Sequence, residues 1–374
     1  MKNILNVIRI IKNQLSKIKL FDPHTDELEK NAINQVLKSN FWASGAGNGN
    51  VKKFEDEFLK YINSKSCVAV NSGTAALNLA LSIYDIKNKE VILPSLSFVA
   101  TANAIVENGG IPKFVDIDEK TLCIDPNKIL ESISNKTKVI LPVHFAGFSS
   151  DLTEISKICK KNKIELIEDA AHSSGASYKN RKIGSHGNLV CFSFHPVKNL
   201  AMPTGGLISI NTKNYKKIEK LLKEKRWCGI TNRKGVDYDV KKIGWNYYMN
   251  EFSAAIGLVQ LKKLNHTNNI RKKIGKIYSE KIEIEKKMPF DKDCSYHFYW
   301  IRVKNRKKFR EELSKKGIET GIHYKPIHNF SLYKSKIKLP ITEKIGKEIV
   351  TLPTHPNISK TDVEKIIKIV NKYS

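Results

Sequence analysis

Three things are scarce in this 374-residue sequence: long apolar runs, paired cysteines and acidic residues. No apolar run approaches the roughly 20 residues that cross a bilayer, so stable membrane insertion is not expected. The six cysteines are scattered and form no CxxC pair, which argues against a zinc site, any other metal site of that kind, and a disulfide framework. Reduced thiols in a cytoplasmic protein are the simplest interpretation.

The shortage of acidic residues leaves a formal charge of +28, from 65 basic and 37 acidic side chains. Such a charge can indicate a nucleic-acid partner, a membrane surface or an acidic substrate. However, the lysines are spread along the whole chain, without an aromatic-interleaved basic patch or a nucleic-acid-binding motif. We therefore interpret the charge as a lysine-rich surface and expect no nucleic-acid partner. A phosphorylated or nucleotide substrate is compatible with it.

Residues 1–20 form a basic amphipathic extension. Four basic residues interrupt its apolar stretch, and no small-residue cleavage site follows, so it is not a signal peptide. A basic amphipathic helix can lie on a membrane surface, but more often it packs on its own protein or on a partner subunit, which we prefer. The apolar residues that fall mostly on one side of this helix are Ile4, Leu5, Val7, Ile8, Ile11, Leu15 and Ile18.

Between residues 67 and 210 short apolar strands alternate with helices, which predicts a mainly parallel sheet with helices on both faces. The expected strands are 67–71, 90–94, 111–117, 138–145, 164–170, 191–194 and a last one after Gly206, and the expected helices are 73–84, 97–108, 127–134 and 152–162. Function in such sheets gathers at the carboxyl ends of the strands. The polar residues expected there include Asn71 to Thr74, Ser95, His144, Glu168 and Asp169.

The pattern changes after about Arg271. We expect a strand at 296–303, a charged amphipathic helix at 306–317, an extended segment at 318–328 and a closing helix at 359–373. A long helix from about Asn250 should join the two parts. The sequence therefore predicts a large α/β domain at residues 21–270 and a smaller C-terminal α+β domain at residues 271–374.

The segment NSGTAAL, residues 71–77, places a helix start directly after a strand. Exposed amides and the helix dipole make such a point a phosphate site, to which Ser72 and Thr74 would add hydroxyls. Serine and threonine also serve routinely as N-caps, so this motif is weak by itself.

Asp169 ends an apolar strand, where a buried carboxylate needs a partner. It could hold a metal, orient a histidine or pair with a protonated ring nitrogen, although too few further ligands can be placed nearby for a metal. His172 follows three residues later. It could be a ligand, an acid–base group or a ring-packing group, and a lone histidine is more often structural.

Lys198 lies in a turn between two strands, at the edge where function is expected. A lysine there is costly unless its amine acts as a point charge or as a nucleophile that forms a Schiff base. A phosphate cradle, a buried aspartate and a lysine on one sheet edge together indicate pyridoxal 5′-phosphate (PLP).

Eight segments then occur in an order that resembles a known family: NSGTAALNLAL, PSLSFVATANAI, PKFVDID, LPVHFAG, IEDAAHSSGASYKNRKIGSHG, FSFHPVKNL, GWNYYMNEFSAAIGLVQL and GIHYKPIH. The chain resembles the DegT/DnrJ/EryC1/StrS family of PLP-dependent sugar aminotransferases from about Asp22 to its C-terminus. These motifs are specific for the family and much less so for a substrate.

The resemblance implies the type I, aspartate aminotransferase-like fold and a homodimer with active sites at the interface. It implies that Lys198 holds the cofactor aldehyde, that Asp169 pairs with the ring nitrogen and that His172 lies near the 3-hydroxyl side. Phe98 would stack on the cofactor ring, and Asn246 would reach the phosphate of the other subunit. The phosphate site of the same chain would comprise Ser72, Gly73, Thr74 and Ser193, and the sugar site would include Trp42, Ser44, His323 and Tyr324.

The implied activity is transfer of an amino group from L-glutamate to a nucleotide-linked 3- or 4-keto-6-deoxy sugar, for the amino sugars of a surface polysaccharide or glycan. Two rivals are a sugar 3-dehydratase, in which histidine replaces the lysine, and a regulator or scaffold that does not transaminate. Thr204 stands where relatives usually have Glu, and Tyr248 where they usually have Arg. Neither change touches Lys198 or Asp169.

Overall fold

The computed structural model describes residues 17–373, so the helix predicted for residues 1–20 lies almost entirely outside the described residues. At its centre is a seven-stranded sheet with the order β1-β9-β8-β5-β4-β2-β3. Neighbouring strands run parallel except β9, which is antiparallel to both β1 and β8. The fold class predicted from the sequence, a mainly parallel sheet with helices on both faces, is confirmed.

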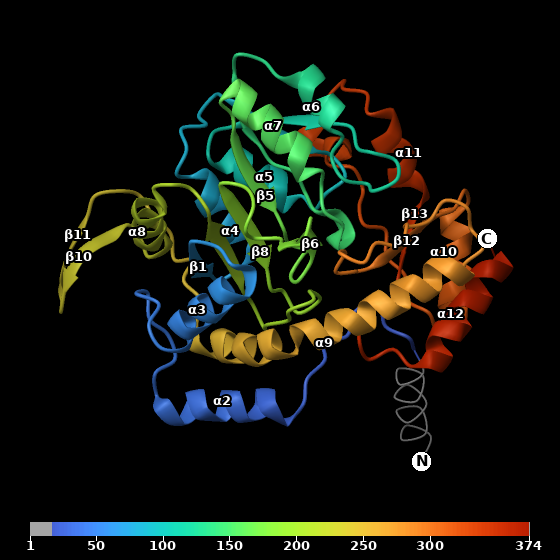
Figure 1. Ribbon diagram of the computed structural model, residues 1–374, viewed down its shortest axis with the longest axis horizontal. Helices are drawn as coiled ribbons and strands as arrows, with labels where there is room; N and C mark the ends of the chain where they lie inside the picture. The colour runs from blue at the N-terminus through green and yellow to red at the C-terminus, as the bar shows by residue number, and fades with distance from the viewer. Residues whose placement is uncertain (1–16, 374) are drawn as a thin grey trace.

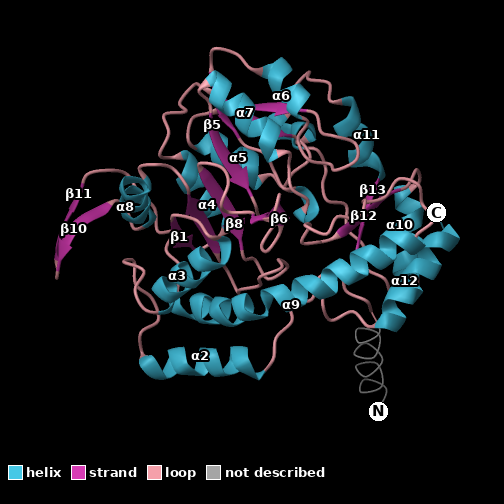
Figure 2. Cartoon of the chain, viewed as in Figure 1, coloured by secondary structure: helices cyan, strands magenta, loops and turns pink. Residues whose placement is uncertain are grey.

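The strands and helices largely follow the predicted alternation (Figure 2). The sheet contains β1 (Ser66–Val70), β2 (Glu90–Pro94), β3 (Ile111–Val115), β4 (Thr137–Ile140), β5 (Glu165–Asp169), β8 (Leu189–Ser193) and β9 (Gly206–Ile210). The helices around it are α2 (Glu27–Ser39), α3 (Asn50–Ile62), α4 (Gly73–Leu81), α5 (Ala100–Glu107), α6 (Pro126–Ser132), α7 (Leu152–Asn162), α8 (Tyr215–Arg226) and α9 (Glu251–Lys281).

Alternation along each strand divides the core into two faces, because successive side chains of a strand point to opposite sides of the sheet. Val68 and Cys191 belong to an apolar cluster with α4 and α5, whereas Ala69 and Phe192 belong to one with α3 and α9. The predicted strands were therefore correct in position, although β4 ends at Ile140, before Pro142, rather than at 145.

The C-terminal part is built on a two-stranded antiparallel sheet of β12 (Tyr299–Arg302) and β13 (Ile349–Leu352). Helices α10 (Arg306–Lys315), α11 (Pro340–Glu348) and α12 (Lys360–Tyr373) accompany it. The long helix α9 begins after its N-cap Asn250 and runs along the molecule to this part, as expected (Figure 1). The boundary predicted at residue 270 stays a prediction, because the apolar cluster of this part also includes Leu96 and Phe145.

Two hairpins and the short 3-10 helices η1 (Phe145–Gly147), η2 (Ile327–Asn329) and η3 (Ser331–Tyr333) complete the described chain. The short pair β6 (Ser177–Tyr178) and β7 (Arg181–Lys182) follows β5, and the pair β10 (Ile230–Lys234) and β11 (Asp237–Val240) projects from the body next to α8 (Figure 1). Among residues 17–373, no helix combines the length and the apolar character needed to cross a membrane.

Candidate active site

A cavity of about 360 Å³ lies at the carboxyl ends of β1, β2, β5 and β8. The parallel direction of these strands brings their ends to one edge of the sheet, where ligands of such folds bind. Ten of the residues predicted from the sequence line this cavity: Ser72, Gly73, Thr74, Phe98, Asp169, His172, Ser193, Lys198, His323 and Tyr324.

One end of the cavity is the N-terminus of α4. The N-cap Ser72 accepts a hydrogen bond from the Ala75 amide with its Oγ at 3.0 Å, and its carbonyl accepts one from the Ala76 amide. The first two amides of the helix, those of Gly73 and Thr74, have no intrahelical acceptor. They line the cavity and are therefore available to an anion, which the helix dipole also favours.

Gly73 allows this end of the cavity to close around a small anion. A Cβ atom at this position would lie 2.6 Å from Cβ of Ser193 and 3.0 Å from its Oγ. Only glycine therefore allows the helix start to lie so close to the hydroxyl at the end of β8. The result is a cradle of backbone amides and hydroxyls with the donors that a phosphate requires.

Asp169 also lines the cavity, and its carboxylate is buried with two donors. Oδ1 accepts the Ala171 amide at 3.1 Å, and Oδ2 accepts the Thr101 hydroxyl at 2.8 Å. Burial raises the pKa of Asp169, and the hydrogen bonds from Ala171 and Thr101 and the charge of Lys198 oppose that rise. Because each carboxylate oxygen can accept more than one bond, Asp169 can still hold a protonated ring nitrogen.

Lys198 is the cation of the cavity, and its side chain is half-buried. Desolvation lowers the pKa of its amine to about 8, although the charge of Asp169 opposes the shift. A substantial fraction of the amine is thus neutral near physiological pH, and the neutral form is the nucleophile.

A column of rings forms one wall. His172 stacks on His297 with ring centroids 4.6 Å apart, and its Nε2 lies 3.0 Å from the Tyr324 hydroxyl. Burial and the charge of Lys198 keep the pKa of His172 well below its usual range. Its Nδ1 is buried without a partner among the described residues, so a polar atom of a ligand can bond to it.

The outer part of the cavity carries Phe98 and His323. Phe98 is 57% exposed, and its ring lies 6.0 Å from that of Tyr324. An aromatic ring this exposed beside a cavity is suited to stack on a planar ligand. His323 bonds to the Thr351 hydroxyl at 2.8 Å, and burial, followed by the charge of Lys198, lowers its pKa to about 4.

Three predicted residues do not line the cavity of this chain: Trp42, Ser44 and Asn246. Ala43, between the first two, pairs with Asn250, and the Asn71 side chain donates to the Asn246 carbonyl at 3.2 Å. The roles predicted for them stay predictions, including that of Asn246 in the site of a second subunit.

Sequence reasoning missed several residues of the cavity, among them Phe21, Thr101 and His195. Thr101 follows Phe98 by one turn at the start of α5, a spacing that could have placed it on the same side. His195 directly precedes the turn of Lys198. Phe21 reaches the cavity by packing on His297, a contact between distant segments for which the local sequence has no signal. Thr204 also lines the cavity and donates its hydroxyl to the Asn71 carbonyl.

Comparison with known proteins identifies the family. Residues 23–371 match the model of the DegT/DnrJ/EryC1/StrS aminotransferase family, and this chain belongs to it. An uncharacterised protein of Methanocaldococcus jannaschii is 34% identical, over 94% of this chain and 96% of its own.

Solved structures with the same fold include two bacterial proteins. Helicobacter pylori PseC, an aminotransferase involved in the biosynthesis of pseudoaminic acid, has a TM-score of 0.90 at 28% identity and covers 96% of this chain and 99% of its own. Spr1654 of Streptococcus pneumoniae, a putative sugar aminotransferase, has a TM-score of 0.90 at 26% identity in its PLP form, which covers 96% of this chain and 98% of its own.

The cavity fits PLP, the cofactor of this family of transaminases. The cradle at Gly73 and Thr74 has donors for the phosphate, Asp169 has lone pairs for the ring nitrogen, and Lys198 has a nucleophilic amine. The unpartnered Nδ1 of His172 can bond to a polar substituent of the ring. The chain is therefore a PLP-dependent transaminase, as the sequence predicted.

Proposed function

We propose that this enzyme moves an amino group from L-glutamate to a nucleotide-linked 3- or 4-keto-6-deoxy sugar, in the biosynthesis of amino sugars for a surface polysaccharide or glycan. The observation that carries the proposal is the half-buried Lys198, whose amine pKa falls to about 8 in the same cavity as Asp169. The names of PseC and Spr1654, which refer to amino-sugar synthesis and to a sugar aminotransferase, support a sugar as the acceptor.

PLP, when bound, supplies an electron sink for the carbanion that forms at the carbon bearing the amine. The carboxylate of Asp169 would hold the ring nitrogen, and its negative charge would favour the protonated form of that nitrogen. The amine of Lys198 removes a proton from the α-carbon of the amino donor, because its lowered pKa leaves it neutral in part. The buried ring of His172 stacks on the partly buried ring of Tyr324 and makes this side of the cavity less accessible to water.

The remaining wall suits the hydroxyl-rich sugar part of the substrate. The imidazole of His323 has a lowered pKa and is therefore uncharged, and among the described residues only its Nδ1 is bonded, to the Thr351 hydroxyl, so its Nε2 can bond to a sugar hydroxyl. We assign the sugar to the side of His323 and Tyr324.

We further propose that two copies form a homodimer in which each copy completes the other's site. Trp42 is 51% exposed and packs on Phe252 of α9, Asn246 is also exposed, and neither lines the cavity of its own chain. Contribution of these residues to the cavity of a second subunit would explain why polar and aromatic side chains remain exposed together.

A non-transaminating role is the second candidate, as a sugar 3-dehydratase or as a regulator or scaffold. Lys198 stands against the dehydratase, in which histidine replaces the lysine. The combination of a cradle, Asp169 and a lysine with a lowered pKa stands against a purely structural role.

The absorption spectrum of the purified protein with PLP, before and after addition of L-glutamate, tests the proposal. We expect a yellow band that glutamate removes, with release of 2-oxoglutarate, and a panel of nucleotide keto-sugars then identifies the acceptor. A stable yellow band that glutamate leaves unchanged would contradict glutamate as the donor. Conversion of a sugar without a new amine would favour the dehydratase.

A further inference from the structure

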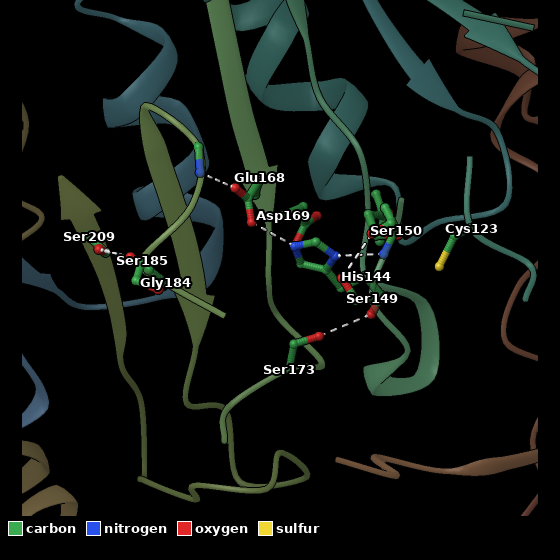
Figure 3. A network of polar contacts seen from close by, with 12 residues as sticks. Cys123, His144, Ser149, Ser150, Glu168, Asp169, Ser173, Gly184, Ser185 and Ser209 are labelled. Carbon is green, nitrogen blue, oxygen red and sulfur yellow. Dashed lines mark hydrogen bonds and ion pairs between the residues drawn. The ribbon is translucent and has the colours of Figure 1, made fainter. Parts of the chain in front are cut away.

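Two carboxylates lie side by side in the sequence at the end of β5, and they point to opposite faces of the sheet. Asp169 faces the cavity, and Glu168 faces the other side, where it is fully buried. Figure 3 shows Glu168 and His144 pointing toward each other, with Glu168 Oε2 2.9 Å from His144 Nε2. A buried carboxylate next to the residue that binds the cofactor ring requires an explanation.

The hydrogen bonds around His144 fix which nitrogen carries its proton. The Ser150 amide donates to Nδ1 at 3.1 Å, so Nδ1 presents a lone pair. Nε2 therefore carries the hydrogen and donates it to Glu168, and the imidazole is neutral. The carboxylate has a second donor on its other oxygen, because the Gly187 amide donates to Oε1.

Gly187 is required for this arrangement. A Cβ atom at residue 187 would lie 2.5 Å from Glu168 Oε1. The turn before β8 can thus approach the carboxylate only with glycine at this position. Each oxygen of Glu168 therefore accepts a hydrogen bond from a different segment, and neither oxygen faces the cavity.

The same segment that holds Glu168 also holds the backbone of Asp169. The His144 amide donates to the Asp169 carbonyl at 3.0 Å, and the Asp169 amide donates to the Pro142 carbonyl at 2.9 Å. The Ser173 hydroxyl adds a bond to the His144 carbonyl at 3.3 Å. Rotation or displacement of the His144 segment would therefore move the residue that carries the catalytic carboxylate.

We propose that Glu168 and His144 are positioning residues for Asp169. Their side-chain bond locks the end of β5 to residues 142–144, so that the Asp169 carboxylate stays aimed at the ring nitrogen of the cofactor. The inference rests on the proposed function only in assigning that nitrogen to Asp169. Its test uses PLP alone, without amino donor or sugar. The result therefore does not depend on whether the proposed donor and acceptor are correct.

Glu168→Gln is the sharpest change, because both partners of the carboxylate are donors. The new amide group must face either the Gly187 amide or His144 Nε2–H, and a switch of the His144 tautomer would turn Nδ1–H against the Ser150 amide. Shape and volume are conserved, so only the bonding of the pair changes.

The experiment measures two properties of the full-length protein with PLP: the dissociation constant of PLP, and the pH midpoint at which the visible band of the bound cofactor changes. We expect Glu168→Gln to weaken PLP binding by roughly 10-fold or more, as for other changes that orient a ligand-binding group indirectly. We also expect the midpoint to shift. Titratable groups that interact with the pair or with Asp169 are Cys159, His186, Cys191, Lys198 and Tyr324.

Matched variants separate positioning from stability. Glu165→Gln, on the same strand, should leave both properties unchanged, and His144→Gln, which keeps a donor for Glu168, should disturb them less than His144→Ala. If Glu168 acts through Asp169, then Glu168→Gln should shift the midpoint no further in an Asp169→Asn background.

The inference is overturned if Glu168→Gln lowers the urea midpoint of the cofactor-free protein yet binds PLP with unchanged affinity and an unchanged band. If Glu168→Gln does not fold, the same test is made with His144→Gln: the dissociation constant of PLP and the pH midpoint of the visible band are measured, and unchanged values overturn the inference. Failure of the wild-type protein to bind PLP would instead refute the assignment of the cavity, which is a different outcome.

Discussion

Two cations of the molecule, Arg226 and Lys198, are held in different ways. Arg226 is completely buried and donates to Glu55 at 2.7 Å and to the carbonyls of Ala69 and Ala46 at 2.8 and 3.1 Å. Lys198, by contrast, forms no ion pair with any residue from 17 to 373, and burial lowers the pKa of its amine to about 8.

The difference separates a structural charge from a reactive one. A guanidinium with a carboxylate and carbonyls around it keeps its charge and joins α8 to β1 and α3. An amine without such a partner loses part of its charge and becomes a nucleophile. The contrast predicts that removal of Lys198 abolishes the chemistry, whereas disruption of the Arg226 pair weakens the fold.

The largest effect expected is that of Lys198→Ala on activity. Turnover should fall by at least about 10³-fold, because both the nucleophile and the base are lost. The melting temperature of the cofactor-free protein should change little, since no ion pair is broken. Lys182→Ala is the matched control, because Lys182 is also a partly buried lysine with a lowered pKa but lies outside the cavity. Near-normal turnover in Lys198→Ala would refute the mechanism.

Glu55→Gln should have the opposite profile. It leaves Arg226 buried without a counter-charge, at a cost of about 3 kcal/mol in the free energy of unfolding. Urea denaturation of the cofactor-free protein measures this cost. Glu57→Gln, on the exposed side of the same helix, should stay within about 0.5 kcal/mol of the wild type. If Glu55→Gln lowers the free energy of unfolding as little as Glu57→Gln does, then Arg226 has no structural role that distinguishes it from Lys198.

The smallest effect concerns the pH dependence of cofactor association. A lowered amine pKa means that the neutral, nucleophilic form of Lys198 grows as pH rises through about 8. The association rate of PLP with the cofactor-free protein should therefore rise about tenfold from pH 7 to pH 9 and then level off. Nα-acetyllysine, as a free amine of ordinary pKa, should react faster up to above pH 10. A similar continued rise for the protein would mean that Lys198 is not desolvated.

The sequence was sufficient for the parts of the fold that depend on local pattern. The alternation of strands and helices located the sheet edge with Asp169 and Lys198, because carboxyl ends of parallel strands converge there. The pattern did not predict that β9 runs antiparallel, since an apolar strand of five residues is equally compatible with either direction.

The contacts that complete the site could not be predicted for a similar reason. The bond between Thr101 and Asp169 joins residues 68 positions apart, and the bond between Glu168 and Gly187 depends on how closely a turn approaches a strand. His144 and Glu168 were placed at the correct edge from the sequence. Their pairing on the face away from the cavity could not be predicted, because it joins side chains 24 positions apart in the sequence.

The position of β9 also has a consequence for synthesis on the ribosome. Strand β1, which ends at the phosphate cradle, is paired in the sheet with β9 alone, through a register that joins Ser66 to Ile210. The cradle therefore has no neighbouring strand to hold it until the chain has been translated to residue 210. The phosphate cradle thus leaves the ribosome long before the strand that fixes it in the sheet, and we expect nascent chains shorter than that to bind PLP poorly.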